Sequence, residues 1–137
     1  MDDNGNAIIV WQQSDGSSLQ IFKAEYRNGQ WTIPADLTDN IGPDGQDAVG
    51  PEVAMDDNGN AIIVWEQSDG SNIQIFKSEY RGGQWTLPAD LTDNISPDGQ
   101  DAVGPEVAMD DNGNAIIVWF QQPDGGGSYQ VFKSEYR

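Results

Sequence analysis

Residues 51–65 read Pro-Glu-Val-Ala-Met-Asp-Asp-Asn-Gly-Asn-Ala-Ile-Ile-Val-Trp, and the same letters return at residues 105–119. The stretch consists of two β-prone runs on either side of an Asp-Asp-Asn-Gly turn. Asn-Gly between such runs predicts a hairpin, because both residues tolerate positive φ. The second run, Ala61 to Trp65, is apolar at every position. A strand of this kind is expected to be covered on both faces.

Turn chemistry marks two further strands in the same copy. Ser-Asp-Gly-Ser at 68–71 predicts a turn, and residues 73–80 predict a third strand that becomes polar toward its end. A short fourth run over 84–87 is followed by Pro88, which favours an edge strand because proline cannot donate to a ladder. No helical period of adequate length is present. The unit is therefore expected to be a four-stranded antiparallel meander.

This unit repeats every 54 residues. Residues 1–54 and 55–108 differ at only seven positions, and residues 109–137 begin a third copy. A fixed period of this kind indicates a small module that buries its apolar surface by stacking on copies of itself. With strands lettered A (inner) to D (outer), the expected units are 1–40 (strands B, C and D), 50–94 (A to D) and 104–137 (A, B and C).

Meanders that repeat at about 40–50 residues are typical of β-propellers, whose radial sheets pack face to face. Residues 51–65 resemble the inner two strands of bacterial propeller repeats of the NHL-like kind, in which a Val-Ala-x-Asp, Gly-Asn turn joins strands one and two. Residues 73–76 resemble their third strand, and the resemblance covers every copy. It implies an all-β fold of four-stranded β-propeller blades, and it implies no particular activity.

Two and a half blades leave apolar faces and strand edges open, whereas propellers close with about four to eight blades. We therefore expect a homo-oligomer in which copies complete a ring, with a dimer of about five or six blades as the smallest solution. The first blade lacks strand A and the last lacks strand D, so the ends do not complement each other directly. A ring with partial blades at the junctions is favoured over strand exchange. Trimers or larger rings are the alternative to a dimer.

Composition excludes several classes of partner. The formal charge is -17, from 23 acidic and six basic residues, which opposes binding to nucleic acid and to anionic membranes. Cysteine and histidine are absent, so thiolate chemistry, zinc-thiolate sites and the commonest general base are missing. Met1 aligns with Met55, which suggests a fragment of a longer repeat protein. The lack of a signal peptide therefore leaves localisation undetermined.

The Asp-Asp-Asn-Gly-Asn turn invites a calcium interpretation, because clustered oxygen ligands suit a hard cation. Its glycine stands one place early for an EF-hand loop, and Gln67 stands where a bidentate Glu is required. Asp and Asn also stabilise tight turns through their own side chains. A structural turn is favoured over a metal site, and no cofactor is expected. The candidate metal ligands are Asp2, Asn4, Asp56, Asn58, Asp110 and Asn112.

Tryptophans occupy two places in the repeat. The ones in the second strand are expected in the core, and packing between blades is also favoured for Trp31 and Trp85 in the outer strand. The alternative for these two is carbohydrate recognition, in which an indole stacks on a sugar while amides and guanidinium groups bind its hydroxyls. One site per copy would bring avidity. The candidate ligand residues are Arg27, Gln30, Trp31, Arg81, Gln84 and Trp85.

Catalysis is not expected. Glu66 and Glu79 are the best pair of acids, yet Glu66 is replaced by Gln12 and Phe120 in the other copies. Each copy also carries a Glu two residues before an Arg, which is typical of a surface charge pattern. The sequence thus predicts a non-enzymatic repeat scaffold that assembles with itself. The alternative is a multivalent lectin with one site per blade.

Overall fold

The computed structural model describes all 137 residues as ten β-strands in three antiparallel sheets. The first sheet contains β1 (Ala7–Ser14), β2 (Leu19–Arg27) and β3 (Gln30–Thr32). The second contains β4 (Ala48–Met55), β5 (Ala61–Ser68), β6 (Ile73–Arg81) and β7 (Gln84–Thr86). The third contains β8 (Ala102–Met109), β9 (Ala115–Gln121) and β10 (Gln130–Tyr136). No helix long and apolar enough to cross a membrane is present.

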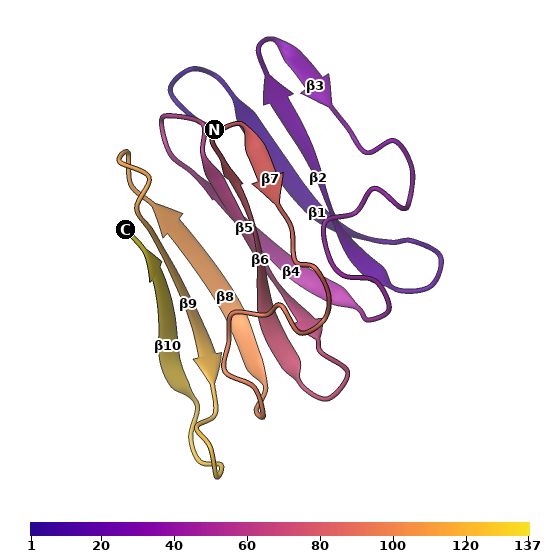
Figure 1. Cartoon of the computed structure of the whole chain (residues 1–137), viewed down its shortest axis with the longest axis vertical. Helices are drawn as coiled ribbons and strands as arrows, with labels where there is room; N and C mark the ends of the chain where they lie inside the picture. The colour runs from indigo at the N-terminus through magenta and orange to yellow at the C-terminus, as the bar shows by residue number, and fades with distance from the viewer.

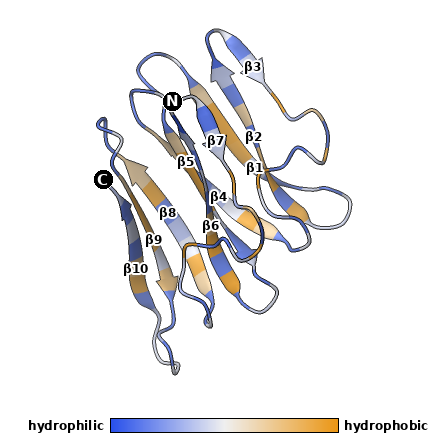
Figure 2. Cartoon of the chain, viewed as in Figure 1, coloured by the Kyte–Doolittle hydropathy of each residue, from blue (hydrophilic) through white to orange (hydrophobic).

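The three sheets lie face to face in a row, like neighbouring blades of a propeller (Figure 1). The second sheet is in the middle and has the strand order β4-β5-β6-β7, which is the predicted four-stranded meander. It is covered on both faces, whereas the first and third sheets each have one neighbour and one open face. The all-β prediction is confirmed. Apolar residues are concentrated in the strands and the loops are mostly polar (Figure 2).

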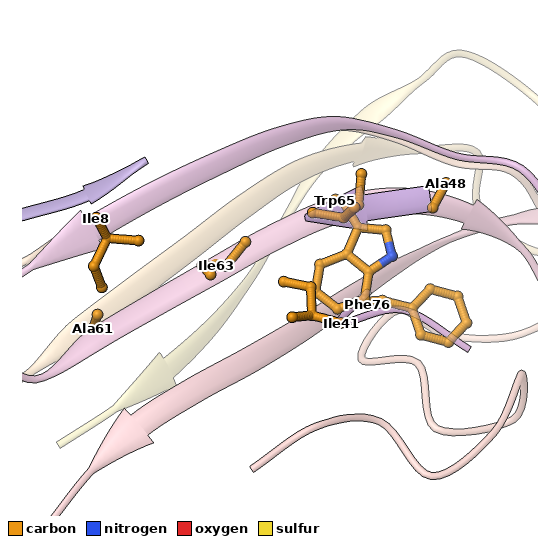
Figure 3. Close-up of a cluster of buried hydrophobic side chains, with 8 residues drawn as sticks. Ile8, Ile41, Ala48, Ala61, Ile63, Trp65 and Phe76 are labelled. Atoms are coloured by element: carbon orange, nitrogen blue, oxygen red, sulfur yellow. The ribbon is translucent and has the colours of Figure 1, made fainter. Parts of the chain in front are cut away.

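The strand β5 is the centre of the core, as its apolar run predicts. Every side chain from Ala61 to Trp65 is buried. Because successive side chains point to opposite faces, Ile63 and Trp65 pack against the first sheet while Ile62 and Val64 pack against the third. The side chains between the first and second sheets form one buried cluster, shown in Figure 3. Both sheets and the connector that joins them contribute residues to it.

The Asp-Asp-Asn-Gly hairpins form where the sequence predicts them, but with a different backbone. In the turn before β5 only Gly59 has positive φ, at 83°, and Asn58 does not. The Gly59 N–H donates to the carbonyl oxygen of Asp56 at 3.1 Å, and the Asp56 N–H donates to the carbonyl oxygen of Asn60 at 3.0 Å. The sharp left-handed step is therefore taken by the residue without a Cβ atom, which avoids the steric penalty that Asn would carry.

The inner strands begin earlier than the sequence predicts. β8 starts at Ala102, and its pairing with β9 shifts between Val103 and Glu106. This bulge contains Gly104, with φ of 64°. A bulge leaves backbone groups outside the ladder, and those groups are free to meet a neighbouring sheet.

Candidate functional site

All six basic residues of the chain lie in three Lys-x-Glu-x-Arg rows, one on the third strand of each copy. These basic rows are Lys23-Glu25-Arg27, Lys77-Glu79-Arg81 and Lys133-Glu135-Arg137. Alternate residues of a strand share a face, so each Glu is held between two cations. In the first row the Glu25 carboxylate lies 2.7 Å from Lys23 Nζ and 2.9 Å from Arg27 Nε. The first two rows face a neighbouring sheet and so differ from the predicted surface charge pattern, whereas the third row is exposed, as predicted.

The first basic row meets two aromatic side chains of the second sheet. Trp85 Nε1 donates a hydrogen bond of 2.9 Å to Glu25 Oε2, and Lys23 Nζ lies 4.6 Å from the centroid of the Trp85 ring. The Arg27 guanidinium lies 3.9 Å above the ring of Tyr80. Cation-π contacts of this kind strengthen when they are shielded from water. The row therefore joins the two sheets.

The pKa of Glu25 follows from these contacts. Burial on its own raises the pKa of this carboxyl, but hydrogen bonds from Lys23, Arg27 and Trp85 stabilise the ionised form, and their sum holds the pKa below its usual range. Glu25 is therefore a fixed negative charge at neutral pH and accepts hydrogen bonds from all three partners.

A hollow of about 160 Å³ lies beside this row, between the first and second sheets. We call it the inter-sheet groove. Lys23 of β2 and Thr32 of β3 line one side, Asp39 and Asn40 come from the β3–β4 connector, and Trp85 closes the other side. Aliphatic side chains complete the lining, with Ile33, Ile41 and Leu87 among them. The groove thus combines an indole and aliphatic carbons with an ammonium, a carboxylate, an amide and a hydroxyl.

The candidate sugar-binding residues of one repeat do not lie together in the structure. Trp85 pairs with Tyr80 across β6 and β7 and faces the first sheet, whereas Arg81 pairs with Gln84 and faces the third. Arg27 and Gln30 are likewise on the side of their sheet opposite to Trp31. Each predicted set is therefore divided between two faces. Trp85 lines the inter-sheet groove, mostly with residues of the preceding copy.

The candidate metal ligands are used by the turns themselves. Asp56 Oδ1 accepts the N–H groups of Asn58 and Asn60 at 2.9 and 2.8 Å, and Asp56 Oδ2 accepts the side-chain amide of Asn60 at 2.6 Å. Asp2 and Asp110 make equivalent bonds in their own turns. Asn4 and Asn58 donate to the carbonyl oxygens of Asp57 and Asp111 in the next turn. No group of three or more acidic side chains is arranged to hold a metal ion.

The second basic row lacks the indole partner that the first one has. Arg81 lies 3.8 Å above the Tyr136 ring and donates to the carbonyl oxygen of Gly113 at 3.0 Å. The third sheet has no counterpart of β7, so no tryptophan approaches Glu79. A hollow of about 110 Å³ beside Lys77 and Glu79 occupies that position.

Buried glutamines are a feature that the sequence interpretation missed. Trp65 Nε1 donates to Gln67 Oε1 at 3.0 Å, and Gln67 Nε2 donates to the carbonyl oxygens of Pro43 and Gln46 at 2.6 and 3.0 Å. Gln121 binds the next connector in the same way. These amides fix the connector that lines the groove. The recurring Trp-x-Gln spacing was the available signal, because a polar residue on a doubly covered strand needs partners.

No protein-family model matches the sequence, and no curated protein matches it. Among solved structures, the chain is similar to an endo-arabinase from Bacteroides thetaiotaomicron, with a TM-score of 0.54 and 14% identity over 98% of this chain and 53% of that one. The chain thus spans about half the length of that enzyme. It is also similar to a fucose lectin from Kordia zhangzhouensis solved with methyl-fucoside, with a TM-score of 0.49 and 18% identity over 96% of this chain and 94% of that one.

At such low identity the likeness to the endo-arabinase establishes the fold alone. The chain is an all-β protein whose three antiparallel sheets resemble the blades of a β-propeller.

Proposed function

We propose that the chain is a non-catalytic carbohydrate-binding repeat protein, and that its binding unit is the inter-sheet groove. The observation that carries the proposal is the convergence of Trp85 with Asn40, Asp39 and Thr32 in one hollow. A sugar ring has an apolar C–H face and a polar edge, which match an amphipathic indole and a set of hydrogen-bonding groups. The volume of about 160 Å³ is below the range of about 300–1,000 Å³ for drug-sized ligands, which suits a single sugar ring.

The charge of the site favours a neutral sugar. Lys23 is the only cation in the groove, and its ammonium is already paired with Glu25 at 2.7 Å. The chain as a whole carries a formal charge of -17, which repels sulfated and carboxylated glycans. The uncharged hydroxyls of a neutral sugar can be hydrogen-bonded without a free cation, and the negative charge of the chain does not repel them.

Two features of the groove oppose catalysis. Glycoside hydrolysis needs two carboxyl groups, one of them with a raised pKa that lets it act as a general acid. The pKa of Glu25 is held low by its three donors, and Asp39 accepts the backbone N–H of Ala35 at 3.1 Å. The Glu25 carboxyl is therefore ionised near neutral pH and has no proton to give to a leaving oxygen.

The test is a glycan array followed by calorimetric titration of any neutral sugar that binds. Asn40→Ala is expected to weaken binding about tenfold, which corresponds to one lost hydrogen bond. Asn94→Ala is the matched control, because Asn94 is the same residue of the next copy but no β7 counterpart faces it. An array without neutral-sugar binding, or equal effects of the two variants, would contradict the proposal.

A second candidate function is a scaffold of NHL-like blades that closes a ring from several copies. It is favoured by the apolar residues on the two open sheet faces: Ile9 is 51% exposed, whereas its counterpart Ile63 in the middle sheet is fully buried. Apolar residues gathered on one face mark an interaction site. Light scattering after gel filtration is the test, and a stable monomer of 14.9 kDa would contradict this function.

A further inference from the structure

The packing between the first and second sheets is the geometry that we use for contact between a sheet of one copy and a sheet of another. The second sheet presents Ala61, Ile63 and Trp65 to the first sheet. The open face of the first sheet carries the identical side chains, Ala7, Ile9 and Trp11, at the equivalent positions of β1. The open face of the first sheet therefore carries the same side chains that, in the second sheet, pack against a neighbouring sheet of this repeat.

The open face of the third sheet supplies the other half of that junction. In the middle sheet, Ile62, Val64 and Ile75 pack against the third sheet and are buried. Their counterparts on the third sheet are Ile116, Val118 and Val131. Val131 is 66% exposed, whereas Ile75 is fully buried. The two open faces thus match the two sides of one junction, and neither matches itself.

We propose that copies associate head to tail, with the third sheet of one copy on the first sheet of the next, and that the partner completes the third basic row. By analogy with Tyr80 and Trp85 at the first row, Tyr26 of the partner subunit lies under Arg137, and Trp31 of the partner subunit donates to Glu135. This inference rests on the proposed self-association and adds its direction and its shared site.

The third basic row is preformed and uncovered. Lys133 Nζ lies 2.6 Å from the Glu135 carboxylate and Arg137 Nε lies 3.4 Å from it, so the row keeps its geometry without a neighbouring sheet. The side chain of Glu135 is 30% exposed, against 10% for Glu25. A hollow of about 300 Å³ beside Glu135 and Arg137 is the space that an incoming sheet would fill. Trp31 is correspondingly exposed at the other end of the chain.

Phe120 fits the same junction. At the two covered junctions, the equivalent side chains Gln12 and Glu66 accept the N–H groups of Gly50 and Gly104 at 2.9 and 2.6 Å. Those glycines belong to β4 and β8, the innermost strands of the following sheets. The first sheet has no such strand, so a third sheet that docks on it meets no glycine N–H at this position. An acceptor there would be left without a donor, whereas a phenyl ring needs none.

The test uses two variants that each block one face. Ile9→Asp blocks the first sheet and Val131→Asp blocks the third, because each places a charge in the proposed junction. Both positions are at least half exposed, so the fold is expected to survive, and circular dichroism checks it. Each variant alone is expected to be a monomer of 14.9 kDa, and an equimolar mixture is expected to form a 1:1 dimer, since one free face of each kind remains.

The outcomes separate the two proposals. A monomeric unmodified chain would overturn self-association altogether. A dimer of Ile9→Asp alone, or of Val131→Asp alone, would show pairing of like faces and would overturn only the head-to-tail direction.

The shared site is tested within the mixed dimer. Glu135→Gln in the Ile9→Asp copy and Trp31→Phe in the Val131→Asp copy are each expected to weaken the dimer about tenfold or more, because each removes a hydrogen bond to a charged group. The dimer that carries both substitutions is expected to be weakened by less than the product of the two single fold-changes, because both substitutions remove the same hydrogen bond. Glu135→Gln in the Val131→Asp copy is the control and is expected to change nothing, because that row lies outside the junction. Independent effects would overturn the shared site.

Discussion

At the scale of single residues, the chain concentrates its few positive charges on three glutamates. Six cations serve 23 acidic residues, and all six flank Glu25, Glu79 or Glu135. Two of these glutamates are enclosed by a neighbouring sheet, and only Glu25 has in addition an indole donor. The same three-residue row therefore occurs in three environments within one molecule, which makes each row a control for the others.

Glu25→Gln is expected to destabilise the fold and to remove part of its pH dependence. The pKa of Glu25 is lowered in the folded state, so the unfolded state binds more protons in acid. The stabilisation is complete above the unfolded pKa and is lost as the pH falls through the folded pKa. At pH 7 the loss on substitution is expected to be about 1.5–3 kcal/mol, the range for hydrogen bonds to charged groups.

Urea unfolding at pH 7 and at pH 3 measures this effect. The difference between Glu25→Gln and the unmodified chain is expected to be large at pH 7 and smaller at pH 3. Glu135→Gln in the Val131→Asp background is the control and is expected to change little, because that row is open to water. A constant difference at both pH values would contradict this account.

Asp57→Asn is expected to raise the melting temperature at low salt. Asp57 lies in a hairpin turn between the turns of Asp3 and Asp111, and desolvation together with the charges of these two residues raises its pKa. The folded state therefore disfavours the ionised carboxylate at neutral pH. Because Asp57 is only partly buried, the gain is expected to vanish at about 1 M salt, where the Debye length is about 3 Å. Asp124→Asn removes an equal charge elsewhere and is expected to have a smaller effect.

At the scale of strands and turns, the sequence predicted what is decided locally. The strand β5 and the hairpin before it follow from an apolar run and a turn, both within about a dozen residues. The bond from Trp85 to Glu25 spans 60 residues, and the bond from Gln67 to Pro43 spans 24. Such pairs depend on how the sheets stack, which no local pattern contains. For that reason Trp85 was predicted as a candidate and its groove partners were not.

The turns before β1 and β5 provide a matched test of packing between sheets. Gly5 and Gly59 have nearly the same φ, 82° and 83°. A Cβ atom on Gly5 meets nothing within 4 Å, whereas one on Gly59 lies 3.1 Å from Arg27 Nη1. Gly5→Ala is expected to cost only the left-handed backbone penalty of about 1–2 kcal/mol. Gly59→Ala is expected to cost about 1 kcal/mol more, because Arg27 is held over Tyr80 and must shift. Equal losses in chemical denaturation would contradict this contact.

At the scale of the whole molecule, two opposing forces act on the open faces. The apolar residues of the first and third sheets favour association by the hydrophobic effect. The formal charge of -17 on each copy opposes it, and every added copy increases the repulsion. Like-charge repulsion acts over the Debye length, whereas contacts across a closed junction are shielded from water. Salt is therefore expected to strengthen association rather than weaken it.

Head-to-tail contact gives either a closed ring or an open filament, and we expect a ring. Head-to-tail contacts close into a ring when the rotation that relates one copy to the next is a whole fraction of a full turn. Neighbouring sheets of a propeller are related by a rotation of this kind about a central axis. The mass in solution is then expected to be a fixed multiple of 14.9 kDa over a hundredfold range of protein concentration, at both low and high salt. Dissociation on dilution is expected to begin at higher protein concentration in 0.01 M salt than in 0.5 M salt, because the acidic surfaces are then unscreened. Analytical ultracentrifugation measures both quantities. A mass that grows steadily with concentration would show a filament, and tighter association at low salt would show that the charged rows rather than the apolar faces hold the copies together.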